Sequence, residues 1–144
     1  MHIPSLDGWC SQRRIDLQRI TLTELDKKIL SDHSENQKPN EACAILFGKD
    51  SIVSEVFLTK NIEESPVNFT ISNDQLIEAY EIAEKKHLEI IGIFHSHPDS
   101  DAFPSNIDIK FMQSNPVVWI IYSGINKNFR AFILESDIVE ISVG

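Results

Sequence analysis

Short apolar runs recur along the chain and predict its strands. These runs are rich in β-branched and aromatic residues and are bounded by turn-forming or polar residues, as half-buried or buried strands are. They lie at residues 20–22, 42–47, 52–58, 88–94, 117–123, 129–134 and 137–142. The runs at 42–47 and 52–58 flank Gly48-Lys49-Asp50-Ser51, which predicts an antiparallel hairpin.

Apolar residues at helical spacing predict a first helix after residue 22. Leu22, Leu25 and Ile29 recur at intervals of three and four. Two pairs have the spacing of a capping box at its start, namely Thr23 with Asp26 and Thr21 with Glu24. The polar stretch 33–40 is expected to end this helix.

A second helix is predicted over residues 73–87, with Ser72 and Gln75 at its start. Its apolar stripe consists of four residues at helical spacing: Leu76, Ala79, Tyr80 and Ala83. A third, short helix is predicted to begin near Ser105. Two or three helices among many strands predict an α+β fold with a mixed sheet.

Composition narrows the class of protein. A chain of 144 residues has the size of one domain, and 42% apolar with 24% charged residues is ordinary for a globular protein. The net charge of −9 argues against nucleic acid as a partner. No apolar run approaches the roughly 20 residues of a membrane helix, and no signal peptide is recognised, so we expect no membrane partner and a cytoplasmic protein. Cys10 and Cys43 form no C-x-x-C pair, which leaves a thiolate metal site unsupported.

The segment 95–108 carries the candidate chemistry. His95 and His97 follow the apolar run directly, and residues two apart on a strand point to the same side. Pro98 ends the strand, and the chain returns to a helix start that holds Ser105 and Asp108. Two imidazoles and one carboxylate suit a catalytic zinc site with an open fourth position. Each piece alone also fits ordinary polar surface or a plain helix cap.

The joint spacing resembles the signature of the JAMM family, also called MPN-plus metallopeptidases. His-x-His, seven residues, then Ser-x-x-Asp is filled by His95, His97, Ser105 and Asp108. Glu41, at the start of the run ending in Gly48, matches the family's upstream glutamate. The segment Ser65-Pro66-x-x-Phe69 is similar to compact prokaryotic members. The resemblance spans about residues 20–142 and extends to the catalytic domain of the proteasome-lid deubiquitinase.

The resemblance implies a fold and a set of roles. The fold is the MPN fold, which is cytidine-deaminase-like, with a mixed, mostly antiparallel sheet and two or three flanking helices. We expect it over residues 19–144, with residues 1–18 as an N-terminal extension. One Zn²⁺ per chain would be held by His95, His97 and Asp108, with a water as fourth ligand. Glu41 would be the general base and Ser105 would stabilise the oxyanion, while Ser96 would face the other way.

The resemblance also implies a reaction, with alternatives left open. The family hydrolyses isopeptide or peptide bonds after the C-terminus of ubiquitin or ubiquitin-like proteins, so these proteins and their conjugates are the expected partners, with proteasome association a further option. The substrate tail would lie along an edge formed in part by residues 61–71. Other members release an amino acid from a sulfur-carrier protein. A metal-free scaffold and a storage or structural zinc site are the remaining alternatives.

Overall fold

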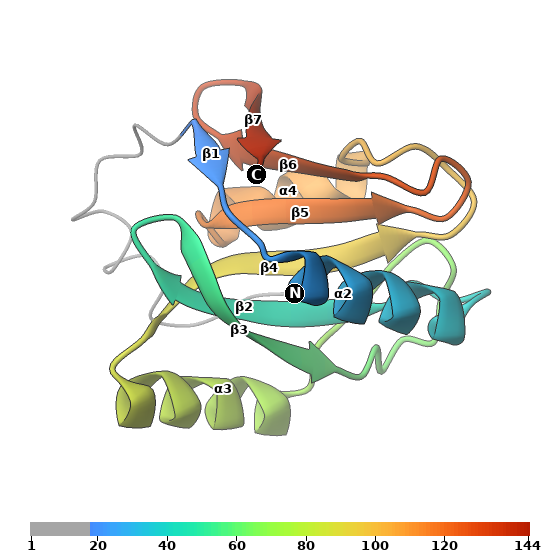
Figure 1. The fold of residues 1–144 in the computed structure, drawn as a ribbon. Helices are drawn as coiled ribbons and strands as arrows, with labels where there is room; N and C mark the ends of the chain where they lie inside the picture. The colour runs from blue at the N-terminus through green and yellow to red at the C-terminus, as the bar shows by residue number, and fades with distance from the viewer. Residues whose placement is uncertain (1–17) are drawn as a thin grey trace.

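The computed structural model describes residues 18–144, which form one seven-stranded sheet and three helices (Figure 1). The helices are α2 (Glu24–Gln37), α3 (Asn73–Lys86) and α4 (Asn106–Ser114). The strands are β1 (Arg19–Ile20), β2 (Cys43–Lys49), β3 (Ile52–Thr59), β4 (Glu89–His97), β5 (Val118–Ser123), β6 (Phe129–Leu134) and β7 (Ile138–Val143). The expected N-terminal extension lies outside the described residues, apart from Gln18.

The sheet is mixed and mostly antiparallel, as predicted. Its strand order is β1-β7-β6-β5-β4-β2-β3, and only the β1–β7 and β4–β5 pairs are parallel. The β4–β5 pair is parallel because α4 connects the two strands. This places β4, which carries both histidines, in the interior of the sheet between β2 and β5.

The helices cover the two faces of the sheet. Leu30 of α2 packs with Leu46 and Phe94 on one face. Residues of α3 and α4, Ala79 and Met112 among them, join the core on the other face. Figure 1 shows α2 in front of the sheet and α4 behind it. Burying each large apolar side chain contributes about 1.5–3 kcal/mol, so both clusters hold the central strands firmly.

The segment after Gln18 ties the sheet together at one end. β1 pairs in parallel with β7. One residue later, the Thr21 N–H donates to the Ser51 carbonyl and the Thr21 carbonyl accepts from the Val53 N–H. The same short segment therefore joins the last strand of the chain to the β2–β3 hairpin.

The first helix follows its prediction except at Leu25. Thr23 and Asp26 form the capping box, which decides between the two candidate caps. The helix continues into the polar stretch 33–40 and ends within it, at Gln37, as expected. It continues because Ser34 is buried and bonds back to the Leu30 carbonyl, and because a His33 ring nitrogen bonds the Cys43 carbonyl. Leu25, expected in the apolar stripe, is exposed.

The hairpin turn is tighter than the predicted four residues. Gly48 and Lys49 belong to β2, and only Asp50 and Ser51 lie between the strands. Both have positive φ, at 50° and 66°, as a two-residue turn that matches the strand twist requires.

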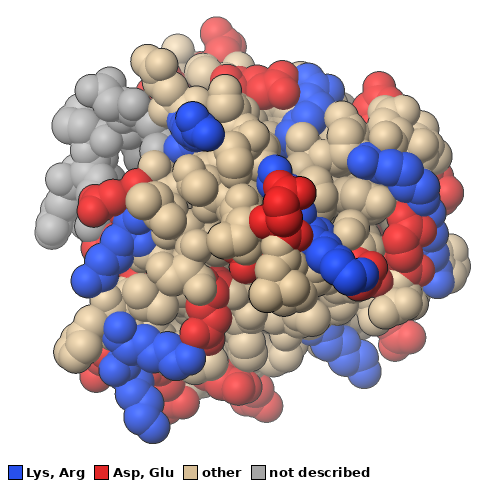
Figure 2. All heavy atoms as spheres, viewed as in Figure 1, with Lys and Arg blue, Asp and Glu red and all other residues tan. Residues whose placement is uncertain are grey.

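Charge is spread over the surface in view. Figure 2 shows acidic and basic side chains interspersed on the face that carries α2. Among the described residues, none of the helices is both long and apolar enough to cross a membrane.

Candidate metal centre

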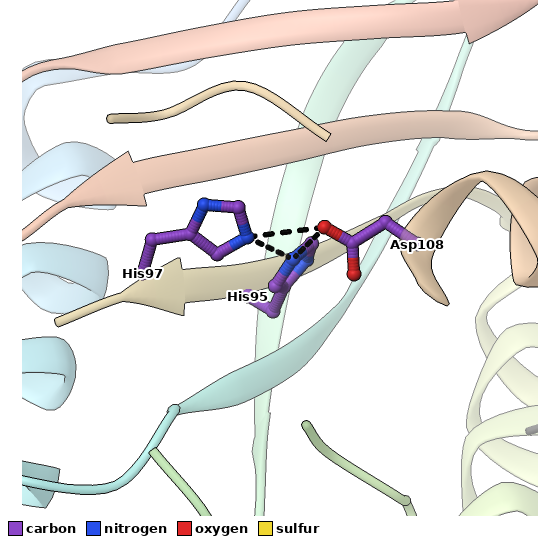
Figure 3. A group of neighbouring side chains, drawn as sticks. All are labelled: His95, His97 and Asp108. Carbon is purple, nitrogen blue, oxygen red and sulfur yellow. Dashed lines mark hydrogen bonds and ion pairs between the residues drawn. The ribbon is translucent and has the colours of Figure 1, made fainter. Parts of the chain in front are cut away.

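Strand β4 presents His95 and His97 on the same side of the sheet (Figure 3). Both are buried, because β4 lies inside the sheet, paired with β2 as far as His95 and with β5 as far as His97. Ser96 between them points to the opposite side, as predicted, where its hydroxyl accepts a bond from the Ala42 N–H. The strand thus places the two imidazoles side by side, while the bond between Ser96 and Ala42 holds the start of β2 next to β4.

The start of α4 delivers the carboxylate. Ser105 caps the helix by accepting from the Asp108 N–H at 3.1 Å, and Asp108 Oδ2 accepts from the Ser105 N–H at 2.9 Å. The same Oδ2 faces both histidines. The plain helix cap and the candidate metal ligand are therefore one arrangement, in which the cap fixes the direction of the Asp108 side chain.

Three ligand atoms meet in a nearly equilateral triangle. His95 Nε2 lies 3.1 Å from His97 Nε2 and 3.1 Å from Asp108 Oδ2, and the third side is 3.0 Å. Ligands of a tetrahedral zinc at 2.0–2.1 Å lie about 3.3 Å from one another. The triangle therefore fits three corners of a zinc tetrahedron and leaves the fourth corner open.

Contacts outside the triad hold both histidine rings in place. The Nδ1 of His97 lies 2.7 Å from the Asp101 carbonyl, which can only accept, so Nδ1 carries the proton. The ring of His95 stacks on Phe69 at 4.8 Å and meets the edge of Trp119. Burial lowers the pKa of His95, which favours the neutral imidazole that a metal requires.

Asp108 is the charged member of the triad. Burial alone would raise the pKa of Asp108, but the adjacent His95, the bonds to both histidines and the Ser105 N–H together hold it below its usual value. Asp108 is thus a carboxylate, and one anionic oxygen ligand beside two imidazole nitrogens is a ligand set that suits a divalent cation.

Glu41 lies beside the triad without joining it. Cys43 pairs with His95, and the Ser96 N–H donates to the Ala42 carbonyl. The same register places Glu41 opposite His97 and on the same face of the sheet. The side chain is 3% exposed, and its Oε1 has no hydrogen-bond partner among the described residues.

The raised pKa of Glu41 is consistent with a cation bound at the triad. Burial, and then the negative charge of Asp108, raise the pKa of Glu41 to about 9. A carboxyl group in that state cannot accept a proton at neutral pH. A dication between the three ligands balances both carboxylates and favours the ionised form of Glu41. The residues present therefore fit a zinc ion.

Cys43 and Phe103 are not part of the triad. Burial raises the pKa of the Cys43 thiol to about 12, so this residue is a buried core member and not a nucleophile. Phe103 is half-exposed and packs edge-on against Phe132. The roles of Asp101 and Trp119 were missed by the sequence reasoning. Asp101 acts through its main chain, which has no signature in the sequence.

Comparison with known proteins identifies the family. Residues 27–134, three quarters of the chain, match the family model described as prokaryotic homologs of the JAB domain. The chain belongs to this family. It is thus a compact prokaryotic domain of the JAMM/MPN type, as the spacing of the motif predicted.

Curated relatives align over the central part of this JAB-domain chain. A desampylase of Pyrococcus furiosus is 38% identical over 94 residues, which cover 65% of this chain and 66% of the relative. A CysO-cysteine peptidase of Mycobacterium tuberculosis is 26% identical, over 63% of this chain and 64% of the relative. A probable TtuB-protein conjugate cleaving protease of Thermus thermophilus is 29% identical, over 71% and 67%. The match thus spans about two thirds of these relatives, slightly less for the first two.

Solved structures share the fold. The protein DSY2949 of Desulfitobacterium hafniense superposes with a TM-score of 0.78 at 25% identity, covering 87% of this chain and 91% of that one. A JAB1/MPN domain protein of Archaeoglobus fulgidus superposes with a TM-score of 0.57 at 18% identity, covering 90% and 98%. The predicted MPN fold is confirmed.

Proposed function

We propose that this JAB-domain protein is a zinc-dependent peptidase that hydrolyses the bond after the C-terminus of a ubiquitin-like protein, with isopeptide conjugates as its main substrates. The observation that carries the proposal is the buried Glu41 carboxyl, unpaired at Oε1 and beside an open-cornered triad of ligands. A structural zinc site has four protein ligands and no use for an adjacent base. The combination of an open corner and a base supports hydrolysis.

One zinc ion per chain would be held by His95 Nε2, His97 Nε2 and Asp108 Oδ2. When bound, zinc supplies a Lewis acid and brings the pKa of a water molecule toward about 7. The Asp101 carbonyl keeps the His97 proton on Nδ1, so that Nε2 stays a ligand throughout turnover. The Ser105 cap holds the Asp108 side chain in the direction that binding requires.

Glu41 would act as the general base and then as the general acid. Its carboxylate takes a proton from the attacking water and later delivers it to the leaving amine. Burial excludes bulk water from the carboxylate, so the proton stays at Glu41 between the two steps. Ser105 would stabilise the oxyanion, because its Oγ serves the cap only as an acceptor and its hydroxyl hydrogen remains available to donate.

Two observations support the proposed substrate class: the names of similar proteins and the segment next to Glu41. The printed names of the relatives include a TtuB-protein conjugate cleaving protease, and this supports ubiquitin-like conjugates as partners. The segment 61–71 borders Glu41 and carries exposed apolar side chains at Ile62 and Val67. An extended tail laid there would contact these side chains, because most N–H groups of the loop already donate to partners within it. Proteasome association stays a prediction that rests on the family resemblance.

A second candidate function is release of a single amino acid from the C-terminus of a sulfur-carrier protein. The similarity to a CysO-cysteine peptidase favours it. The chemistry at the metal centre is the same in both cases, and the two functions differ only in the leaving amine. Substrate trials therefore separate them.

The test combines metal analysis with cleavage of two matched substrates. One ubiquitin-like protein is prepared with an isopeptide-linked lysine and with a single C-terminal amino acid. We expect about one zinc per chain, cleavage of the isopeptide that chelator abolishes and zinc restores, and loss of both zinc and activity in His97→Ala. Full zinc occupancy in His97→Ala would contradict the ligand set. Preference for the single amino acid would favour the second candidate.

A further inference from the structure

Glu41 lies where regular strand pairing ends on both sides. Strand β2 begins at Cys43, which pairs with His95 on one side and Thr59 on the other. Continued by two residues, the first register reaches His97 and the second reaches Asn61. Asn61 thus occupies the position at which β3 would pair with Glu41, although β3 ends at Thr59.

The side chain of Asn61 replaces the missing strand pairing. Its Nδ2 donates to the Glu41 carbonyl at 3.0 Å and to the Asn68 carbonyl at 3.0 Å. Its Oδ1 accepts from the Glu63 N–H at 3.0 Å and the Thr70 N–H at 3.1 Å. Two donor and two acceptor bonds use the full capacity of a carboxamide, and the residue is 4% exposed.

The same loop holds the other main-chain group of Glu41. The Glu41 N–H donates to the Ser65 carbonyl at 2.8 Å. Both polar main-chain groups of Glu41 therefore bond to residues 61–65, and neither depends on a regular sheet ladder. The carboxyl side chain, in contrast, has no hydrogen-bond partner at Oε1. The position of that oxygen depends on the main chain that carries it.

We propose that Asn61 is a positioning residue for Glu41: its carboxamide joins the main chain of Glu41 to the loop 61–70 and thereby fixes where the carboxyl group lies relative to the metal ligands. The inference deepens the proposed function and rests on it for the role of Glu41. Misplacing a reacting group by about 1 Å can cost about 10²-fold in rate. The four hydrogen bonds of Asn61 go to main-chain groups and none goes to a metal ligand, so its effect on the centre passes through Glu41.

Two variants and one control test the proposal. Asn61→Asp keeps the shape and the Oδ1 acceptor for the Glu63 and Thr70 amides, but it presents an oxygen to the carbonyls of Glu41 and Asn68. Asn61→Ala removes all four bonds and serves if the first variant folds poorly. The control is Asn115→Ala, because Asn115 is also buried and its Nδ2 also donates to a main-chain carbonyl, that of Phe111, away from Glu41.

Hydrogen exchange supplies a measurement that does not depend on activity. We expect the Glu41 amide to exchange at least 10-fold faster in both Asn61 variants, at unchanged zinc affinity, and to be unaffected in Asn115→Ala. In the zinc-loaded enzyme we expect kcat to fall about 10²-fold with KM little changed. In a Glu41→Gln background, Asn61→Asp should add almost nothing, because both changes act on the same group.

Each result bears on one part of the argument. Unchanged exchange at Glu41, or a loss of zinc affinity, would overturn the positioning role. A full additional loss of rate in the Glu41→Gln background would overturn it as well, because Asn61 would then act elsewhere. If Glu41→Gln itself kept normal turnover while the exchange results held, the proposed role of Glu41 as the base would fail and the anchoring of Glu41 by Asn61 would stand.

Discussion

At the scale of single residues, Glu41 is the most informative position. Glu41→Gln keeps the shape of the side chain but removes its capacity to accept a proton. Positioned acid–base groups contribute about 10²–10⁴-fold, so turnover should fall by that factor. Zinc content should stay near that of the unchanged protein, because Glu41 is not part of the ligand triangle. Elemental analysis and steady-state kinetics on the same preparation check both expectations.

The melting temperature of Glu41→Gln also distinguishes a general base from a zinc ligand. A buried carboxyl whose pKa lies near 9 is costly to keep ionised, and an uncharged amide carries no such cost. The Glu41→Gln protein should therefore melt no lower than the unchanged protein. Loss of zinc from this variant would make Glu41 a ligand, and normal turnover on a verified substrate would assign the base to another residue.

The sequence revealed these residues to different degrees. His95, His97 and Asp108 could be found because they belong to one short segment, and strand alternation plus a helix cap already imply their directions. Glu41 lies 54 positions before His95 and was reached only through the family resemblance. Asn61 and Asp101 were missed because each acts on or through a main-chain carbonyl, and such contacts depend on tertiary register.

At the scale of elements, the end of β5 and the loop after it hold the segment that follows His97. The Ser123 hydroxyl donates to the Ser100 carbonyl at 2.8 Å, and the Gly124 N–H donates to the His97 carbonyl at 2.9 Å. Asn126 Nδ2 bonds the Asp101 carboxylate at 2.8 Å. These contacts hold residues 97–101, whose Asp101 carbonyl orients the His97 ring.

Ser123→Ala should therefore weaken zinc binding without removing any ligand. Residues that orient a ligand typically change metal affinity by 10–100-fold, and an effect near the lower end, about 10-fold, is expected for one bond of several. Competition with a chromophoric chelator measures the affinity directly. Unchanged affinity would show that the Gly124 and Asn126 contacts suffice to hold the Asp101 carbonyl in place.

The end of α2 is fixed to the same loop through Glu35. Its carboxylate pairs with Lys127 at 2.7 Å and Lys38 at 2.9 Å and accepts from the Tyr122 hydroxyl. The bonds to Lys127 and Lys38 lower the pKa of Glu35 from 4.5 to about 2. Because the folded pKa is the lower one, the stabilisation is present above pH 4.5 and is lost as the pH falls from 4.5 toward 2.

Comparison of Glu35→Gln with the unchanged protein tests this pairing. The side chain is 38% exposed, so solvent screening limits its contribution to about 1 kcal/mol at most. Urea unfolding at pH 7 should show a deficit of that size in Glu35→Gln. The deficit should shrink at pH values below 4.5. A deficit that is independent of pH would mean that packing, and not the charge of Glu35, is responsible.

Elements were predictable where local signals and burial agree. α3 lies almost where its cap and apolar stripe placed it, because Leu76, Ala79 and Ala83 all face the core. α2 ends within the polar stretch that was expected to end it, but its last residue could not be predicted, because the polar residues there gain their contacts from β2 and the β5–β6 loop. Helix ends that depend on partners distant in the sequence have no local signal.

At the scale of the whole molecule, we expect the fold to form without the metal. Apolar clusters fill both faces of the sheet, and the ligand-bearing elements β4 and α4 pack into them through Ile93, Phe94 and Met112. The topology itself was not readable from the runs of apolar residues, since seven strands allow many orders. The parallel β4–β5 pair follows from the α4 crossover, and β1 reaches β7 only across the whole chain.

Zinc removal should therefore leave a folded protein that melts at a lower temperature. A ligand that binds only the folded state stabilises it by RT ln(1 + [L]/Kd), about 2.7 kcal/mol at 100 times Kd. For a chain of this size, that stabilisation raises Tm by roughly 5–10 °C. Far-UV circular dichroism at 25 °C should be the same with and without chelator, while the melting curve shifts down and recovers when zinc is added back. Collapse of the circular dichroism signal on adding chelator would instead mean that His95, His97 and Asp108 hold a structural zinc, and the open corner beside Glu41 would then need another explanation.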